Sequence, residues 1–113
     1  MQKKFLVLYH IPAKVMEGWM KVDAAERQKL EAEMMQKWHE WENRQGSALL
    51  STDGAGRTKL VSQATISDTR NDIVVCSVVM ADTHDAASAL FQTHPHLTIP
   101  EATIEIMELR GMS

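Results

Sequence analysis

Three histidines, His10, His94 and His96, have the side chains in this chain best suited to proton transfer. An imidazole changes its charge near neutral pH, so it can take or give a proton in a reaction on a small molecule. His94 and His96 flank Pro95 in the stretch Phe91–Leu97. Proline lacks an amide hydrogen and disfavours helical angles in the residue before it, so a helix should end at or just before His94. The two imidazoles are therefore expected on a bend.

We expect His10 and His94 to be the acid–base pair of a site, with His96 orienting it. His10 lies at the end of the first predicted strand, and the bend precedes the last strand. If these strands are antiparallel neighbours, the end of the first lies opposite the start of the last. The alternative is structural: His94 binds backbone groups at the helix end, and His10 is partly buried with its hydrogen bonds satisfied. The sequence leaves both interpretations open.

The segment Ala13–Val22 is expected to be a short helical flap. It is too apolar for a plain solvated loop, and Gly18 interrupts it. Its simplest role is to cover the core. As a lid it would place Trp19 and Met20 on the wall of a ligand-binding pocket, because long ordered connections in small domains are often functional.

Other site chemistries fit the sequence less well. The His94-Pro-His96 spacing is not a standard zinc motif and no cysteine pair assists it, so we expect no metal and no cofactor. The stretch Gly54–Lys59 departs from the phosphate-binding P-loop pattern and precedes a strand, so we interpret it as a hairpin loop. Trp38 and Trp41 lie on one helical stripe, which is more typical of a core than of an aromatic ligand pocket.

Length and composition indicate one globular domain spanning residues 1–113. Hydrophobic residues make up 44% of the chain, and the formal charge of -3 disfavours nucleic acid as a partner. The longest apolar runs, Phe5–Tyr9 and Ile73–Ala81, are far shorter than the roughly 20 residues that span a membrane. Lys3 and Lys4 resemble the start of a signal peptide, but no cleavage site follows the short apolar run. With Cys76 as its single cysteine, the protein is expected in the cytoplasm.

Hydrophobic periodicity, together with the residues that end helices and form turns, predicts elements in the order βαββαβ. This is the α+β arrangement of ferredoxin-like domains. A capping box, Asp23 to Glu26, should start the long helix, and Gly46 should end it. The residues Ser47–Ser51 add at most a small extended piece. The main strands and helices are predicted at Lys4–Ile11, 23–45, Thr58–Ile66, Ile73–Ala81, His84–Gln92 and Thr103–Leu109. The second and third strands should pair as a hairpin around a turn at Ser67–Asp72.

The first and third predicted strands are apolar on both faces, so they should be the central strands of a four-stranded antiparallel sheet. Two helices cover only one face of such a sheet. Leaving the other face in water would cost roughly 1.5 to 3 kcal/mol for each large apolar side chain. We therefore expect a homodimer in which two sheets pack face to face as a dimeric α+β barrel.

Four stretches carry a resemblance to a known family: Phe5–His10 at the start, Ala81-Asp-Thr83 before the second helix, His94-Pro95, and Ala102–Ile106 at the end. On these stretches the chain resembles the YCII-related family, small ferredoxin-like dimers grouped with the dimeric α+β barrel proteins. The resemblance implies a small enzyme with a pocket containing a His and an Asp. His94-Pro95 stands at the family's Asp-Pro position.

Three functions follow as hypotheses. The first is a small dimeric enzyme that uses His94 and His10 for acid–base chemistry on an unknown small molecule. The second is a non-catalytic module that binds a small ligand in the same cleft. The third, from fold analogy alone, is a cofactor-free oxygenase of the barrel superfamily. None of them involves a nucleic acid or a membrane.

Overall fold

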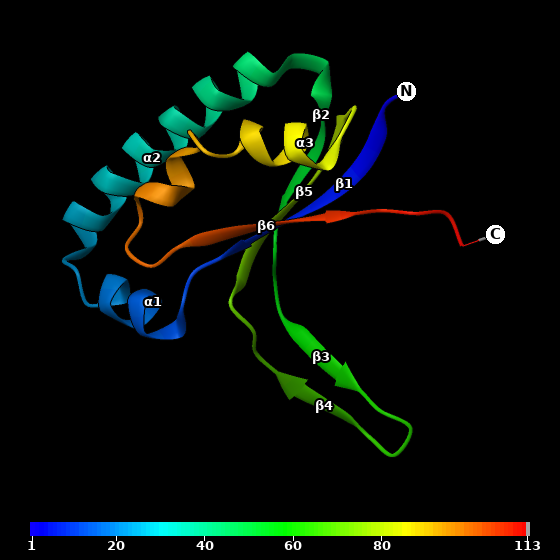
Figure 1. Ribbon diagram of the computed structural model, residues 1–113. Helices are drawn as coiled ribbons and strands as arrows, with labels where there is room; N and C mark the ends of the chain where they lie inside the picture. Colours follow the sequence, from blue (N-terminus) through cyan, green and yellow to red (C-terminus); the bar gives the residue numbers. More distant parts are fainter. Residues whose placement is uncertain (113) are drawn as a thin grey trace.

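The computed structural model describes residues 1–112, which form a mixed α+β structure around a four-stranded antiparallel sheet (Figure 1). The strand order is β2-β5-β1-β6. The four strands are β1 (Lys3–His10), β2 (Leu49–Gly54), β5 (Ile73–Ala81) and β6 (Thr103–Glu108). The two strands that are apolar on both faces, β1 and β5, are central, as the sequence predicts.

One predicted strand of the sheet was wrong. Leu49–Gly54, not Thr58–Ile66, forms β2 and pairs with β5, with Thr52 opposite Ser77. The stretch predicted as a single strand is broken by a turn, in which Ser62 N–H donates to the Thr65 carbonyl at 2.9 Å. The Ser62 hydroxyl also accepts from the Thr65 N–H at 3.1 Å, which stabilises the turn locally.

The two halves of that stretch form a separate hairpin, which we call the arm (residues 55–72). Its strands are β3 (Thr58–Val61) and β4 (Ile66–Thr69), so the residues predicted as a connecting turn include a strand. Both strands pair with each other and not with the main sheet. In Figure 1 the arm projects away from the sheet and the helices. The alternating pattern in this stretch therefore does not mark a face that packs on the core.

Three helices accompany the sheet: α1 (Ala13–Met20), α2 (Ala24–Gln45) and α3 (His84–Leu90). Figure 1 shows α2 and α3 on the same side of the sheet. The predicted cap of the long helix is confirmed, because Asp23 Oδ2 accepts from the Glu26 N–H at 3.3 Å. Gly46, at φ 58°, follows its last residue and begins the short 3₁₀ helix η1 (Gly46–Ala48). A second 3₁₀ helix, η2, spans Pro95–Thr98.

The core lies between the sheet and these helices. Alternate residues of the two central strands face it, and the aromatic residues of α2 and the end of α3 cover them. The buried apolar residues are Phe5, Val7, Tyr9, Trp38, Trp41, Val79, Ala81, Ala87 and Phe91. The helix side of the sheet is therefore densely covered.

The opposite face of the sheet, which we call the open face, has no helix over it (Figure 1). Leu6 and Leu8 of β1 lie there, opposite Val78 and Cys76 of β5, and all four side chains are only partly buried. The accessible surface of the chain is 8158 Å², against roughly 6,200 Å² for a folded monomer of this mass. The excess of about 1,900 Å² comes from an uncovered sheet and a projecting arm.

The radius of gyration agrees with that excess. It is 16.0 Å, whereas a compact domain of this length has about 13 Å. The thinnest dimension of the molecule is 20 Å, which corresponds to two layers of secondary structure. No helix within residues 1–112 combines the length and the hydrophobicity that crossing a membrane requires.

Candidate functional site

The bend that carries His94 and His96 folds into the core on the helix side of the sheet. His94 caps η2 and is 2% exposed, and His96, inside η2, is 1% exposed. The α3 helix ends at Leu90, slightly before the predicted end, and Pro95 stands in the first turn of η2. Both imidazoles are therefore interior groups that a substrate cannot reach in this conformation.

The hydrogen bonds of His94 fix its tautomer. Its Nδ1 accepts from the His96 backbone N–H at 2.9 Å, so in the neutral ring the proton is on Nε2. The buried Nε2 has no hydrogen-bond partner among the described residues. The rings of Trp38 and Trp41 each lie 4.4 Å from the His94 ring, centroid to centroid, at interplanar angles of 88° and 60°. A donor in this position is surrounded by aromatic faces, which accept N–H groups only weakly.

Burial determines the charge of both histidines. Burial, with a smaller contribution from the neighbouring His96, lowers the pKa of His94 to about 4. Burial also lowers the pKa of His96, although its hydrogen bond to the His10 backbone acts in the opposite direction. At neutral pH both rings are uncharged. This fits a structural role for His94 better than proton transfer to a substrate.

His96 connects the bend to the first strand. Its Nε2 donates to the His10 carbonyl oxygen at 3.0 Å, across 86 positions of the sequence. The ring also lies against Tyr9, with the two centroids 5.4 Å apart at 88°. His96 therefore orients the η2 segment relative to β1 rather than a bound molecule.

The His10 side chain lies on the open face. Phe5, Val7 and Tyr9 face the helices, so the alternate residues of β1, including His10, face the other way. His10 Nε2 lies 2.5 Å from Glu105 Oε1, and the His10 side chain is 20% exposed. The contact is close enough for an ion pair, but its angles are not those of a hydrogen bond.

The structure thus does not bring the His10 and His94 side chains together. They lie on opposite faces of the sheet, and the hydrogen bond between His10 and the bend uses the His10 backbone and the His96 ring. The partner that His10 does have, Glu105, was not predicted. Glu105 alternates with Ile104 and Ile106, and it lies on the open face because its register partner is Leu8. That alternating pattern predicts a polar side chain on one face of β6. Only the strand register shows which residue lies next to that side chain.

A chain of hydroxyl groups lies within the core near the buried histidines. The Tyr9 hydroxyl is 3.0 Å from Ser77 Oγ, which is 2.8 Å from Thr52 Oγ1. Burial raises the pKa of Tyr9 to about 12, with the Ser77 bond acting against it and the nearby Glu42 carboxylate adding to it. The phenol stays protonated at neutral pH and so keeps its hydrogen bond to Ser77. The three hydrogen-bonded hydroxyl groups thereby connect β1, β5 and β2.

The residues predicted to wall a pocket lie elsewhere. Trp19 Nε1 donates to Glu31 Oε1 on α2 at 3.3 Å, so the indole lies against the first half of that helix. Met20 is exposed. The α1 segment is helical as predicted, and Lys14 Nζ lies 3.3 Å from Glu101 Oε2. These contacts hold α1 beside the first half of α2 and beside the segment before β6, and no residue of α1 is buried.

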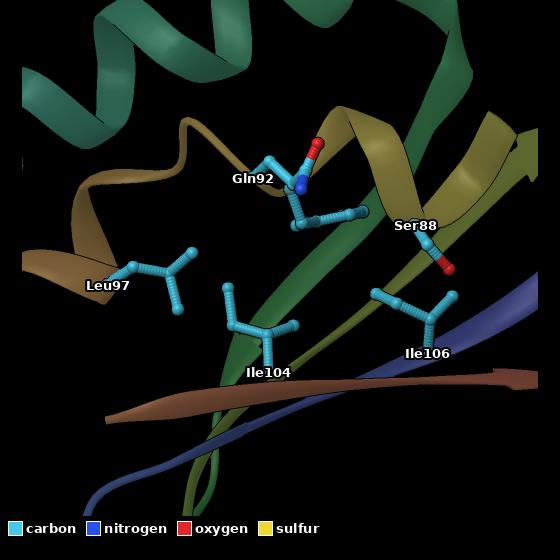
Figure 2. A pocket seen from close by; sticks show the side chains of 6 residues that line it. Ser88, Gln92, Leu97, Ile104 and Ile106 are labelled. Carbon is cyan, nitrogen blue, oxygen red and sulfur yellow. The ribbon is translucent and has the colours of Figure 1, made fainter. Parts of the chain in front are cut away.

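An apolar hollow of about 250 Å³ lies between α3, η2 and β6 on the helix side. Figure 2 shows Leu97, Ile104 and Ile106 directed toward it, with Ser88 and Gln92 at its rim. Its volume is slightly below the usual range of small-molecule sites, and no acid or base lines it. It offers a surface for an apolar group rather than for proton transfer.

Metal binding has no geometric support in the part of the chain that the structure describes. Within residues 1–112, no three His, Cys, Asp or Glu side chains cluster closely enough to hold a metal ion. No protein-family model and no curated protein matches the sequence. The resemblance to the YCII-related family therefore stays a prediction.

Proposed function

We infer that the protein is a homodimer of ferredoxin-like domains, and that it handles a small molecule at His10 and Glu105 inside a dimeric α+β barrel. The observation that carries this proposal is the His10–Glu105 contact, an imidazole and a carboxylate on an apolar sheet face that no helix covers. The β2-β5-β1-β6 order, with β1 and β5 central, supports the ferredoxin-like part of this proposal.

The amount of uncovered surface supports the dimer. An excess of about 1,900 Å² per chain matches half of a 2,000 to 5,000 Å² obligate homodimer interface. The open face also has the required chemistry, because its centre is apolar and its polar groups lie on the edge strands or, like His10, at the end of a central strand. A second sheet packed on it would remove Leu6, Leu8 and Val78 from water.

The same packing would turn the His10–Glu105 pair into an enclosed site. Nε2 of His10 lies beside the carboxylate, so its Nδ1 is the atom that can accept a proton from a bound molecule. A rotation of the ring that aligns Nε2–H with Glu105 would fix this tautomer, as the third group of a catalytic triad does for its histidine. The proposed chemistry is general base catalysis by one imidazole, without His94. The one cysteine, partly buried Cys76, is consistent with a cytoplasmic location.

Two measurements test the proposal. Sedimentation equilibrium at micromolar concentration should give a mass near twice 12.7 kDa. A thermal-shift screen of small acids and aromatics should find a ligand that stabilises the protein, and His10→Asn and Glu105→Gln should each abolish that shift. His39→Asn, on the exposed surface of α2, is the matched control and should keep it. A monomeric wild type, or a ligand shift that both site variants retain, would reject the proposal.

A non-catalytic binding module is the second candidate. It is favoured by the separation of His10 from His94, which leaves one titratable histidine at the site. The same screen separates the two functions. A ligand that binds at His10 and is recovered unchanged after prolonged incubation supports the module, whereas conversion that stops in His10→Asn supports the enzyme.

A further inference from the structure

The arm, residues 55–72, has no contact with the core that accounts for its apolar side chains. Val61 and Ile66 near its tip are 70% and 72% exposed. Isolated two-stranded hairpins are only marginally stable in water. Hydrogen bonds hold the root, where Ala55 N–H donates to the Val74 carbonyl and Ile11 N–H to the Asp72 carbonyl, both at 2.9 Å. The rest of the arm extends into solvent (Figure 1).

The register of the arm sorts its side chains onto two sides. Val61 is opposite Ile66, and Lys59 is opposite Asp68, so these four residues share one side. The Lys59 Nζ and Asp68 Oδ1 atoms lie 2.5 Å apart. On this side, the arm therefore has apolar residues at its tip and an ion pair closer to its root.

Two arginines follow on the same side at the root. Arg57 and Arg70 are the next pair along this side, one step beyond the opposed Thr58 and Thr69. No carboxylate of residues 1–112 forms a salt bridge with either of them. Like charges facing each other across two strands destabilise a hairpin unless an anion lies between them. A hollow of about 410 Å³ lies at this position, lined by both arginines.

The open face of the sheet has the complementary pattern. Its centre is apolar, and its carboxylates, Asp53 and Glu105, lie on the edge strands β2 and β6. Asp53 is opposite Cys76 in the register, which places it on the open face, and it forms no salt bridge with another described residue. Glu105 is already held by His10 at the opposite edge. An apolar tip and a cationic root thus match an apolar face whose β2 edge carries a carboxylate, Asp53, that is unpaired among the described residues.

The dimensions of the two surfaces also match. The seven residues from Ala55 to Val61 reach about 23 Å when extended, at about 3.3 Å per residue. A four-stranded sheet measures about 15 Å from edge strand to edge strand. The arm is long enough to cross the open face of another molecule.

We propose that the arm clasps a second copy of this chain beside the sheet–sheet contact, with Val61 and Ile66 against apolar side chains of its open face and Arg57 and Arg70 against Asp53 at its β2 edge. This inference rests on the proposed homodimer and adds the segment that secures it. It also assigns the arginine-lined hollow to a carboxylate of the partner rather than to a free anion.

Charge reversal tests the clasp. The double variant Arg57→Glu/Arg70→Glu and the tip variant Val61→Ser/Ile66→Ser should each raise the dimer dissociation constant at least about tenfold. Adding Asp53→Lys to the arginine variant should restore the dimer dissociation constant to within about threefold of wild type. The control Lys21→Glu/Lys29→Glu, with exposed cations outside the arm, should leave it unchanged. Circular dichroism should show that every variant remains folded.

The outcomes separate the two proposals. A wild-type dimer with unchanged affinity in both arm variants would overturn the clasp but leave the sheet-face dimer standing. A charge-swapped chain that does not recover would also overturn the clasp, because the arginines would then act on something other than the partner's carboxylates. A wild type that is monomeric at high micromolar concentration would overturn both.

Discussion

The His96 imidazole donates through Nε2 to the carbonyl oxygen of His10 at 3.0 Å, joining the bend after α3 to the end of β1. The same residue donates its backbone N–H to His94 Nδ1 at 2.9 Å. His96 is therefore bonded on both sides and almost fully buried. Because the bond uses only the backbone of His10, the His10 side chain remains free to face Glu105 on the other side of the sheet. The two buried histidines, His94 and His96, thus position the end of β1, where the partly buried His10 lies.

Replacing His96 by alanine should lower the free energy of unfolding by about 2 to 4 kcal/mol, because a buried ring and its hydrogen bond are lost together. His96→Gln should recover part of that loss, since its amide can still donate to the His10 carbonyl. Urea unfolding at a fixed protein concentration measures the free energy of unfolding of both variants. His39→Ala on the exposed side of α2 should change the value by less than about 0.5 kcal/mol. An equally small effect of His96→Ala would contradict the structural role.

Stability should fall as the pH drops from about 6.5 toward 4. Burial holds the pKa of His94 at about 4 in the folded protein, whereas an unfolded histidine titrates near 6.5. Between those values the unfolded chain binds the proton and the folded chain does not, so acid favours unfolding. At pH 5 this one residue should account for a loss of about 2 kcal/mol relative to pH 7.5.

The variant His94→Asn isolates that contribution. The side-chain oxygen of the asparagine can still accept from the backbone N–H of His96, as in an Asx turn, but the asparagine does not titrate. Its unfolding free energy should therefore fall about 2 kcal/mol less than that of wild type between pH 7.5 and pH 5. Identical pH profiles for the two proteins would mean that His94 is not the group responsible.

Ser77→Ala should destabilise the protein by about 1 to 3 kcal/mol, because it leaves both the Tyr9 hydroxyl and Thr52 without their shared partner. Tyr9→Phe should cost less, since the Ser77–Thr52 bond survives it. The double variant should cost less than the sum of the two, and a double-mutant cycle measures the difference. Strict additivity would show that the Tyr9–Ser77 bond contributes nothing.

Val78→Lys should convert the dimer into a folded monomer. The side chain lies on the open face, where a lysine is compatible with water but not with a second sheet. Met20→Lys is the matched control, because it adds the same charge at an exposed apolar residue on α1. Sedimentation velocity should separate the two species. A Val78→Lys protein that still sediments as a dimer would move the interface away from the open face.

The sequence was sufficient for features that depend on neighbouring residues. The apolar runs of β1 and β5 predicted the central strands, Asp23 predicted the start of α2, and Pro95 predicted the bend. Each follows from local conformational preference. The strand β2 was predicted only as a small extended piece. It is short, contains Ser51, Thr52 and Asp53, and is held by long-range pairing with β5, so it has little local signal.

The site depended on information that the sequence does not contain. Because β1 is apolar on both faces, its pattern does not say which face the helices cover. That choice is made in three dimensions, when Trp38 and Trp41 of α2 and the buried His94 pack around Tyr9 and Phe91. Once Tyr9 faces the helices, its neighbour His10 must face the open side, where β6 supplies Glu105. The sequence thus determined that the bend with His94 and His96 lies beside the end of β1, and only tertiary packing decided on which side of the sheet each histidine side chain lies.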